Sequence, residues 1–455
     1  MTLDWIPQTR MPTGERFLER ADILSWGRVV RQPQHVARPS FRDELPSLIS
    51  EPGWKSKLAI GLRRSYGDSC LNSAGALLDA TSLNRVIAFD PQSGRLQAEA
   101  GISLSDLLRL VVPHGWFLPT TPGTRFVTLG GAVANDVHGK NHHGAGTFGA
   151  SVTGLGLLRS DGRRPKLTRE LEPELFCATI GGLGLTGVIE WVEFQLVPIR
   201  SAVLDVEIVP YGSLDDFWSV AEASVGRFEH TVAWIDCLSS GASAGRGVFT
   251  RANWAEDGQF DVHDDRTFKS LPFEFPSFAL NRLSVAGFNE FYYRLHRLKQ
   301  GKVRQHYSAF FYPLDAIHNW NRLYGSRGML QYQCAIPWGN ERVCMRALLD
   351  KIARSGQASF LAVIKTFGDR PSPGMLSFPR PGATLALDFP NRGPETLAVM
   401  SQLDDIVREA GGALYPAKDG RMPADMFKLA YPRWEAFAAH KDPRMSSDFW
   451  RRVAG

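Results

Sequence analysis

The stretch GGAVANDVHGKNHHGAGTFG, residues 130–149, concentrates six glycines and three histidines in a polar, loop-like segment. Such a segment suits one of three purposes: binding a metal ion, binding a phosphorylated cofactor, or forming tight turns without a ligand. The histidines have the spacing H-x3-H-H, but a metal site of the H-E-x-x-H type needs a helix that brings two histidines onto one face. Gly144 and Gly146 disfavour that helix, so we expect no metal site.

A phosphorylated cofactor fits the segment better. Glycines let the backbone approach a ligand closely, and successive N–H groups form concave anion sites without a lysine. The Walker motif G-x-x-x-x-G-K-[ST] and the Rossmann motif G-x-G-x-x-G are both absent from this segment. A second run, GGLGLTG at 181–187, precedes a predicted strand and does not open a helix. We therefore expect a cofactor site outside the common nucleotide-binding folds.

The composition of the 455-residue chain is that of a soluble globular protein, with 44% hydrophobic and 22% charged residues. A chain of this length exceeds the size at which one hydrophobic core keeps growing, so we expect two domains. Five cysteines, odd in number and far apart, argue against a disulfide framework or a zinc ribbon. The net charge of +5 favours an anionic ligand or a membrane surface over nucleic acid, because the basic residues are scattered.

The N-terminal segment MTLDWIPQTRMPTGERF has neither the apolar core of a signal peptide nor a twin-arginine pair followed by one. No run in the chain approaches the roughly 20 consecutive apolar residues of a membrane span. We therefore expect a cytoplasmic protein.

The first 200 residues alternate short strands with few helices. Strands are predicted at 57–62, 86–90, 95–101, 154–163 and 187–199. Ser103 and Asp106 resemble a capping box, and the apolar residues after them recur at helical spacing, which predicts a helix that Gly115 can end. The pattern indicates one α+β unit whose loops, and not its helices, hold the unusual chemistry.

Past residue 200, apolar and polar residues alternate as in half-buried strands. The strands predicted from this alternation lie at 203–209, 329–337, 360–367 and 382–389. Helices are predicted at 341–355, ended by Gly356, and from Pro394 to Gly411. The order β-α-β-β-α gives an antiparallel sheet with helices on one face. The other face is either a ligand wall or simply solvated, and it carries Gln331, Gln333, Lys365, Thr384, Ala386 and Asp388.

Eight short motifs follow one another in an order that spans most of the chain. They are RSYGD (64–68), PGTR (122–125), DVHGKNHH (136–143), GLTG (184–187), YPLD (312–315), LQYQ (330–333), LDFP (387–390) and AKDGR (417–421). With these motifs the chain resembles the FAD-binding oxidoreductases of the vanillyl-alcohol oxidase type, in which loops between two small α/β subdomains wrap the FAD pyrophosphate. Within that family it is most similar to the enzymes that oxidise a polyprenyl-phosphoryl ribose.

The resemblance implies an α+β fold: a two-subdomain FAD-binding domain plus a substrate domain built on an antiparallel sheet. Residues 1–198 are expected to form the FAD-binding domain and 199–412 the substrate-binding domain. Residues 413–455 are expected to return to the first domain, because AKDGR comes back to the isoalloxazine in this family. Some relatives attach the flavin to a histidine in the loop occupied here by RRSYGDS. Since this loop has no histidine, we expect non-covalent FAD.

By the same resemblance, the glycine-rich motifs supply the FAD contacts. These contacts are implied for Arg64, Ser65, Tyr66, Gly67, Asp68, Pro122, Gly123, Thr124, Gly130, Gly131, Asp136, His138, Gly139, Asn141, His142, Gly184, Thr186, Gly187, Tyr415 and Lys418. An ammonium held at Lys418 would stabilise the negative charge that hydride arrival at flavin N5 leaves at N1 and the C2 carbonyl. The group that takes the hydroxyl proton is left open between Lys418, His138 and Tyr66.

The substrate contacts implied by the resemblance are Tyr312, Gln331, Gln333, Lys365, Thr384 and Ala386. Lys365 suits an anionic phosphodiester. Mycobacterial members carry a cysteine at the position of Ala386 and an asparagine at that of Thr384. Loss of the thiol removes covalent capture by nitroaromatic suicide inhibitors but spares hydride chemistry, because the flavin does the redox work. Arg63 and Ile60 stand where the family usually has glycine and arginine, which affects the local cofactor contacts.

The implied reaction is the FAD-dependent oxidation of the 2-hydroxyl of a polyprenyl-phosphoryl-β-D-ribose to a ketone, the first half of an epimerisation that makes the arabinose donor of cell-envelope glycan. A separate NAD(P)H-dependent short-chain reductase is the expected partner, and the lipid-linked substrate implies peripheral membrane contact. Two alternatives stay open. One is an oxidase of a free sugar, alditol or aldonolactone on the same fold, and the other is a flavin-binding subunit without catalysis of its own.

Overall fold

A small four-stranded sheet starts the fold of this computed structural model, which describes residues 16–265, 269–276 and 279–455. In spatial order its strands are β1 (Leu18–Arg20), β2 (Gln34–Ala37), β4 (Ala76–Asp79) and β3 (Lys57–Ile60). The pairs β2–β4 and β3–β4 are parallel. Helix α1 (Leu45–Ser50) buries Leu45, Leu48 and Ile49 against this sheet. The expectation about targeting signals concerns residues 1–15, which lie outside the described ranges.

A second, antiparallel sheet confirms the strands predicted between residues 86 and 199, and the strand predicted at 57–62 is β3 of the first sheet. Its spatial order is β5 (Val86–Asp90), β6 (Arg95–Glu99), β10 (Val188–Gln195), β8 (Val152–Leu158) and β9 (Lys166–Leu167). The predicted cap is also confirmed, because the Ser103 hydroxyl accepts a hydrogen bond from the Asp106 N–H at the start of α2 (Leu104–Val111). Gly115 ends the following turn with φ 76°. Helix α5 (Pro173–Thr179) packs in the same core.

The glycine-rich stretch differs from the loop that its composition predicts. It contains α3 (Leu129–Ala134), capped by the Thr128 hydroxyl, and the single turn α4 (His142–Ala145). The interpretation of the whole stretch as a loop was therefore wrong, although neither helix contains both His138 and His142, as expected from the glycines. Tertiary contacts stabilise α4 although glycine lowers its helix propensity. Asn141 donates a hydrogen bond to the Pro119 carbonyl, and Arg370 donates one to the carbonyl of Ala145. Gly146, at φ 76°, ends the turn.

The largest sheet has eight strands, all paired antiparallel. In spatial order they are β16 (Gly301–His306), β12 (Val203–Tyr211), β14 (Gly247–Trp254), β13 (His230–Ile235), β19 (Ala362–Phe367), β20 (Gly382–Pro390), β18 (Met329–Pro337) and β21 (Ala413–Leu414). The predicted β-α-β-β-α order is confirmed within this sheet. The sequence did not show that β12, β13, β14 and β16 extend the same sheet.

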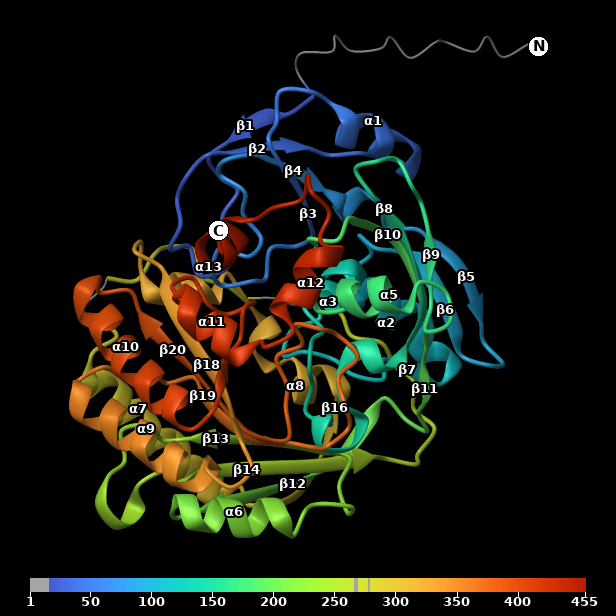
Figure 1. Cartoon of the computed structure of the whole chain (residues 1–455). Helices are drawn as coiled ribbons and strands as arrows, with labels where there is room; N and C mark the ends of the chain where they lie inside the picture. The colour runs from blue at the N-terminus through green and yellow to red at the C-terminus, as the bar shows by residue number, and fades with distance from the viewer. Residues whose placement is uncertain (1–15, 266–268, 277–278) are drawn as a thin grey trace.

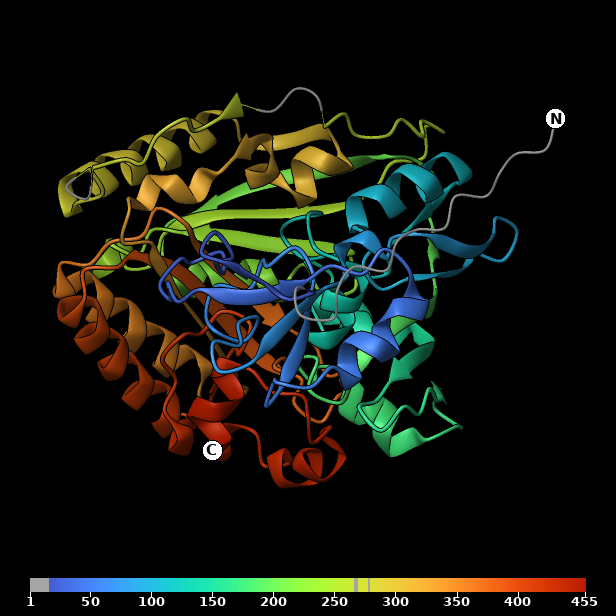
Figure 2. The same cartoon turned by 90° about the horizontal axis from the view of Figure 1, so that it is seen from above.

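Helices cover the two faces of the large sheet unequally. One face packs against α6 (Leu214–Glu222), α9 (Glu341–Ser355) and α10 (Pro394–Glu409) through a continuous apolar core (Figure 1). On the opposite face lie α7 (Arg282–Leu298) and α8 (Tyr307–Phe311), with the four-stranded and five-stranded sheets beyond them (Figure 2). The helix-poor part of this second face is therefore available to a ligand.

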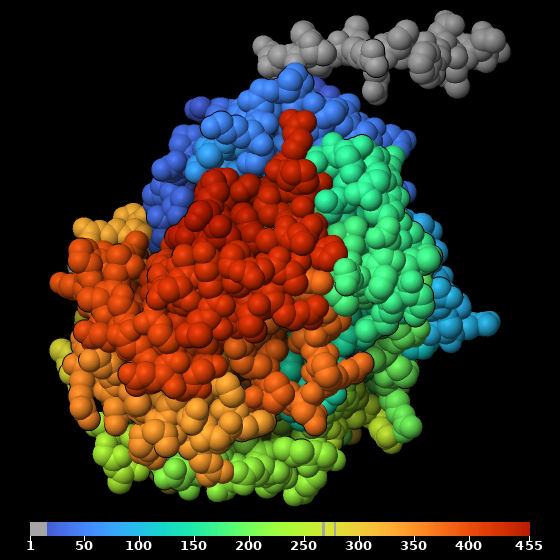
Figure 3. Space-filling view, in the orientation of Figure 1, coloured from blue at the N-terminus to red at the C-terminus, as the bar shows by residue number. Residues whose placement is uncertain are grey.

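The C-terminal segment crosses back over the junction of the sheets. Its helices are α11 (Ala424–Ala430), α12 (Trp434–His440) and α13 (Asp448–Ala454). Figure 3 shows this segment, in red, lying between the blue N-terminal part, the green second sheet and the orange helices. The backbone of Lys57 in β3 bonds to Arg444 and Ser446. The division at 198 and 412 stays a prediction, because β21 belongs to the large sheet while the helices after it return to the first.

Short elements complete the architecture. They are the pairs β7 (Trp116–Phe117) with β11 (Val197–Pro198) and β15 (Lys269–Ser270) with β17 (Ile317–His318), and the 3-10 helices η1 (Arg42–Glu44), η2 (Ala80–Ser82), η3 (Val112–His114), η4 (Phe148–Ser151), η5 (Gly241–Ser243), η6 (Pro313–Ala316) and η7 (Trp320–Tyr324). None of the helices in the described ranges combines the length and the apolar character needed to cross a membrane.

Candidate functional site

A cavity of about 950 Å³ separates the glycine-rich segments from the helix-poor face of the large sheet. Its size lies at the upper end of the roughly 300–1,000 Å³ range of ligand and cofactor sites. The sheet wall follows from the pairing register, in which Gln333, Ala386, Val363 and Trp234 form one cross-strand row. All six residues that the sequence placed on the possible ligand face of the sheet, from Gln331 to Asp388, line the cavity.

The facing wall is built from glycines contributed by four segments. Gly61, Gly123, Gly130, Gly131, Gly139, Gly184 and Gly187 line the cavity. A Cβ built at Gly123 would meet no atom within 4 Å, so this glycine exposes its backbone to open cavity space. Gly130 is needed for packing, because a Cβ there would lie 2.8 Å from the Cβ of Ala100. The wall therefore offers backbone groups and little side-chain bulk, as a phosphorylated cofactor requires.

Lys418 and Tyr66 meet at one end of the cavity. The ammonium of Lys418 lies 3.9 Å from the centroid of the Tyr66 ring. The Tyr66 N–H donates to the carbonyl of Ala417, which ties the two motifs RSYGD and AKDGR together. Burial lowers the pKa of Lys418 to about 8, while the nearby Asp388 carboxylate opposes that shift. Burial raises the pKa of the Tyr66 hydroxyl well above its ordinary value.

Asp388 is a buried carboxyl group beside this pair. It accepts a hydrogen bond from Gln331 Nε2 at 2.5 Å, and its backbone N–H donates to the Ser359 hydroxyl. Burial raises the pKa of Asp388 to about 7, with Gln331 and the charge of Lys418 opposing the rise. Lys418 and Asp388 therefore titrate as an interacting pair close to neutral pH.

His138 connects the glycine wall to the sheet wall. Its Nδ1 lies 2.9 Å from the ammonium of Lys365, which also donates to the carbonyl of Gly139. When Lys365 is protonated its ammonium has no lone pair, so Nδ1 accepts and the ring proton resides on Nε2. The side-chain Nε2 of Gln333 lies 3.0 Å from that ring Nε2. Turning the Gln333 amide by 180° would place its oxygen where it accepts the ring proton. Burial and the charge of Lys365 hold the pKa of His138 well below its usual range, which keeps the ring neutral.

Lys140 is a residue that sequence reasoning left without a role. It lines the cavity, and its ammonium bonds to the carbonyl of Phe310. Burial lowers the pKa of Lys140 to about 7, and burial together with Lys140 and Lys418 lowers that of Lys365 to about 7. Lys140 lies inside the motif DVHGKNHH, so the sequence did carry a signal for it. Trp26, Asn135 and Trp234 also line the cavity, and no sequence pattern singles them out.

Most of the predicted site residues line the cavity. These are Arg64, Ser65, Tyr66, Pro122, Gly123, Thr124, Gly130, Gly131, His138, Gly139, Gly184, Gly187, Gln331, Gln333, Lys365, Thr384, Ala386, Tyr415 and Lys418. Their roles stay predictions.

Seven predicted residues lie behind the cavity walls and not on them: Gly67, Asp68, Asp136, Asn141, His142, Thr186 and Tyr312. Asp136 accepts from the Gly149 N–H and the Ser377 hydroxyl, so it braces the glycine-rich stretch. Tyr312 bonds to the Thr121 hydroxyl at 2.6 Å. In the structure Asp136 and Tyr312 hold the wall in place through protein partners, whereas both ring nitrogens of His142 are buried without a hydrogen-bond partner among the described residues.

The histidines of the glycine-rich stretch diverge. His143 bonds to the carbonyl of Phe228, while His142 packs against Phe367 with ring centroids 4.3 Å apart. Within the described ranges, no group of three histidine, cysteine, aspartate or glutamate side chains is arranged to hold a metal ion.

Arg63 supports the fit of the cavity to a phosphorylated cofactor. It lines the cavity, and its Nη1 is buried without a hydrogen-bond partner among the described residues. Its φ of 53° lies in the left-handed region that glycine adopts more readily than arginine, in keeping with the glycine that the family resemblance implies at this position. Together with the glycine wall and Lys418, this free donor matches what the phosphates and flavin ring of FAD require. FAD bound here would be held by the backbone of the glycine wall and by Arg63.

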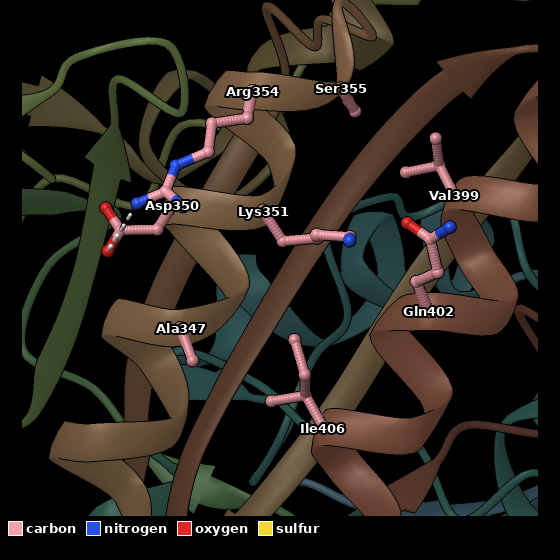
Figure 4. A pocket seen from close by; sticks show the side chains of 8 residues that line it. All are labelled: Ala347, Asp350, Lys351, Arg354, Ser355, Val399, Gln402 and Ile406. Carbon is pink, nitrogen blue, oxygen red and sulfur yellow. Dashed lines mark ion pairs between the residues drawn. The ribbon is translucent and has the colours of Figure 1, made fainter.

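A second hollow, of about 600 Å³, lies between α9 and α10 on the helix-covered side of the large sheet. Lys351 extends from α9 across it toward Gln402 of α10 (Figure 4). None of its eight lining residues is buried. It has no contact with the glycine-rich wall, and the cavity at Lys418 is the better candidate site.

Comparisons with known proteins agree with this geometry. The FAD binding domain model matches residues 33–168. The chain is 35% identical over 449 residues to decaprenylphosphoryl-β-D-ribose oxidase of Mycolicibacterium smegmatis, covering 95% of this chain and 97% of the relative. It is 32% identical over 373 residues to an uncharacterised protein of Streptomyces coelicolor, covering 77% of this chain and all of the relative. L-Gulonolactone oxidase of Mus musculus is 31% identical over 157 residues, about a third of each chain.

The chain is thus an FAD-dependent oxidoreductase, and its similarity to the mycobacterial enzyme runs through both the glycine wall and the sheet wall of the cavity. It belongs to the decaprenylphosphoryl-β-D-ribose oxidase family of FAD-binding proteins.

Proposed function

We propose that this enzyme oxidises the 2-hydroxyl of a polyprenyl-phosphoryl-β-D-ribose to a ketone. The observation that carries the proposal is the pair of half-buried lysines, Lys140 and Lys365, in the same cavity as Lys418. Both lose cationic character through burial, and Lys365 also through the neighbouring lysines. An anionic phosphodiester would restore that charge, whereas a neutral sugar or lactone would leave it uncompensated.

Bound FAD supplies a hydride acceptor at its N5 atom. Of the three groups that could take the hydroxyl proton, Lys418 has the most suitable pKa, because burial brings it to about 8. The raised pKa of Tyr66 keeps its phenol protonated, so it serves as a hydrogen-bond donor. The Nδ1 of His138 accepts from Lys365, and its Nε2 faces Gln333, so the ring has no free lone pair for the substrate. Lys418 thus receives the proton and becomes the cation that favours the developing charge.

The second half of the epimerisation requires reduction of the ketone. We assign this step to a separate NAD(P)H-dependent short-chain reductase, because reduction of the ketone needs a hydride donor and the glycine-walled cavity is matched to FAD. Together the two steps would invert the configuration at C2 and give the arabinose donor for cell-envelope glycan.

The test is anaerobic reduction of the flavin. The purified holoenzyme is mixed with polyprenyl-phosphoryl ribose, or a shorter-chain analogue, and the visible flavin absorbance is followed. We expect bleaching with the phosphorylated lipid sugar and none with ribose, alditols or aldonolactones. Lys418→Met should retain FAD and lose bleaching by more than about a hundredfold. Bleaching by a free sugar or lactone alone would assign the enzyme to that substrate class and reject the proposal.

A further inference from the structure

Helix α7 presents an apolar face to solvent. Leu283 and Leu298 are each 85% exposed and Phe291 is 65% exposed. Leu283, Gly287 and Phe291 are four residues apart, and Leu298 follows Phe291 by seven, so these residues lie along one side of the helix. The opposite side is buried through Val285 and Asn289. An ordinary surface helix shows the reverse arrangement, so this exposed stripe indicates an interaction surface.

Positive charge surrounds this stripe. Residues 282–304 contain six lysines and arginines and a single acidic residue, Glu290. Arg282, Arg297, Lys299 and Lys302 make no ion pair with another described residue. Arg294 stands within the stripe, between Phe291 and Leu298, and pairs with Glu290 on its own helix. A dry protein interface would have to desolvate these cations, whereas the headgroup region of an anionic bilayer supplies phosphates for them.

The same helix forms part of the cavity wall. Phe288, Tyr292 and His296 line the cavity from α7, and Tyr292 packs on Trp234 of the sheet with ring centroids 4.7 Å apart. In Figure 2 this yellow helix lies at the outer margin of the molecule, on the far side of the sheet from the orange and red helices. A surface bound by α7 would therefore lie next to the cavity that receives the substrate.

We propose that Leu283, Phe291 and Leu298 insert into the headgroup boundary of an anionic membrane, with the cations that are unpaired among the described residues, Arg282, Arg297, Lys299 and Lys302, bound to lipid phosphates. The cavity then faces the bilayer that holds the prenyl chain. The purpose of this surface rests on the proposed lipid-linked substrate, but the surface itself can be tested without any substrate.

The experiment is co-sedimentation of the FAD-loaded protein with vesicles. One set contains phosphatidylcholine alone, and the other contains equal amounts of phosphatidylcholine and phosphatidylglycerol. We expect binding to the anionic vesicles only, weakening as salt is raised. Phe291→Glu/Leu298→Glu and, separately, Arg297→Glu/Lys299→Glu should each lower the partition coefficient by more than about tenfold. Val343→Glu, at a 78% exposed site on α9, is the matched control and should bind as the wild type does.

Three results would overturn the inference. The first is equal binding of the α7 variants and the wild type, and the second is no binding of the wild type to anionic vesicles. The third is a wild-type dimer in solution that Phe291→Glu/Leu298→Glu converts to a monomer, which would make the stripe an interface between copies. Bleaching of the flavin by a soluble short-chain analogue separates this test from the test of the proposed function. The α7 variants should still show this bleaching. Absence of bleaching in the wild type would reject the proposed substrate and leave the membrane-binding surface unaffected.

Discussion

Replacement of Arg452 by methionine should disorganise the Lys418 end of the cavity from a distance. Arg452 lies on α13 and binds Asp68 through two hydrogen bonds, of 3.0 and 2.7 Å, and Asp419 through a third of 3.2 Å. Asp68 follows Tyr66 by two residues, and Asp419 follows Lys418 directly. The guanidinium therefore joins the two loops that carry the candidate catalytic residues.

The expected cost follows from burial. Both carboxylates are 8% exposed and the arginine side chain is 25% exposed. Removing one partner from a buried ion pair costs roughly 3–5 kcal/mol, and partial exposure of the arginine favours the lower end, about 3 kcal/mol. Burial already raises the pKa of Asp68, and loss of the arginine removes the main opposing influence. The destabilisation should therefore shrink as the pH falls and Asp68 is protonated.

The assay combines urea unfolding of the holoenzyme with anaerobic flavin reduction. Arg452→Met should lower the reduction rate by up to about a hundredfold if the loops shift by about 1 Å. The triple variant Arg452→Met/Asp68→Asn/Asp419→Asn should recover most of the stability, because no unpaired charge remains buried. Arg408→Met, which breaks only exposed pairs, should cost less than about 1 kcal/mol. Equal stability and equal rates for Arg452→Met and Arg408→Met would refute this reasoning.

Three further predictions concern the cavity walls. Gly123→Ala should leave folding intact and weaken FAD binding, because the added Cβ would enter the open cavity; titration of the apoprotein with FAD measures this. The control Gly144→Ala also adds a Cβ with no atom nearby, but outside the cavity, and should change neither folding nor FAD binding. Affinity for a phosphorylated substrate should fall as the pH rises through about 7, because free Lys365 then loses the proton that an anion needs; a KM independent of pH from 6 to 9, as for a neutral sugar, would contradict this. Ala386→Cys should gain covalent labelling by nitroaromatic inhibitors during turnover, detected by intact mass, and an unlabelled variant would exclude that position from the reactive end of the cavity.

Local patterns in the sequence predicted the elements well. The helix 341–355 and the strand 329–337 lie where their periodicity places them, because alternation and helical spacing depend only on neighbours along the chain. The polar face with Gln331, Gln333 and Lys365 also follows from alternation. Local propensity failed at α3 and α4. Contacts from Pro119 and Arg370 hold the turn of α4, and the Thr128 hydroxyl caps α3.

The sequence by itself determined the class of the cofactor site. Glycines that leave the backbone accessible and the lysine in AKDGR each meet a chemical requirement of that cofactor by the residue type at a single position. The tertiary structure alone decided that eight strands form one sheet, that Arg452 joins the RSYGD and AKDGR motifs, and that α7 turns its apolar face outward. Alternation permits many strand partners, and a charge permits many counter-charges. Only the packing of residues hundreds of positions apart selects among them, because each such contact depends on the whole fold being in place.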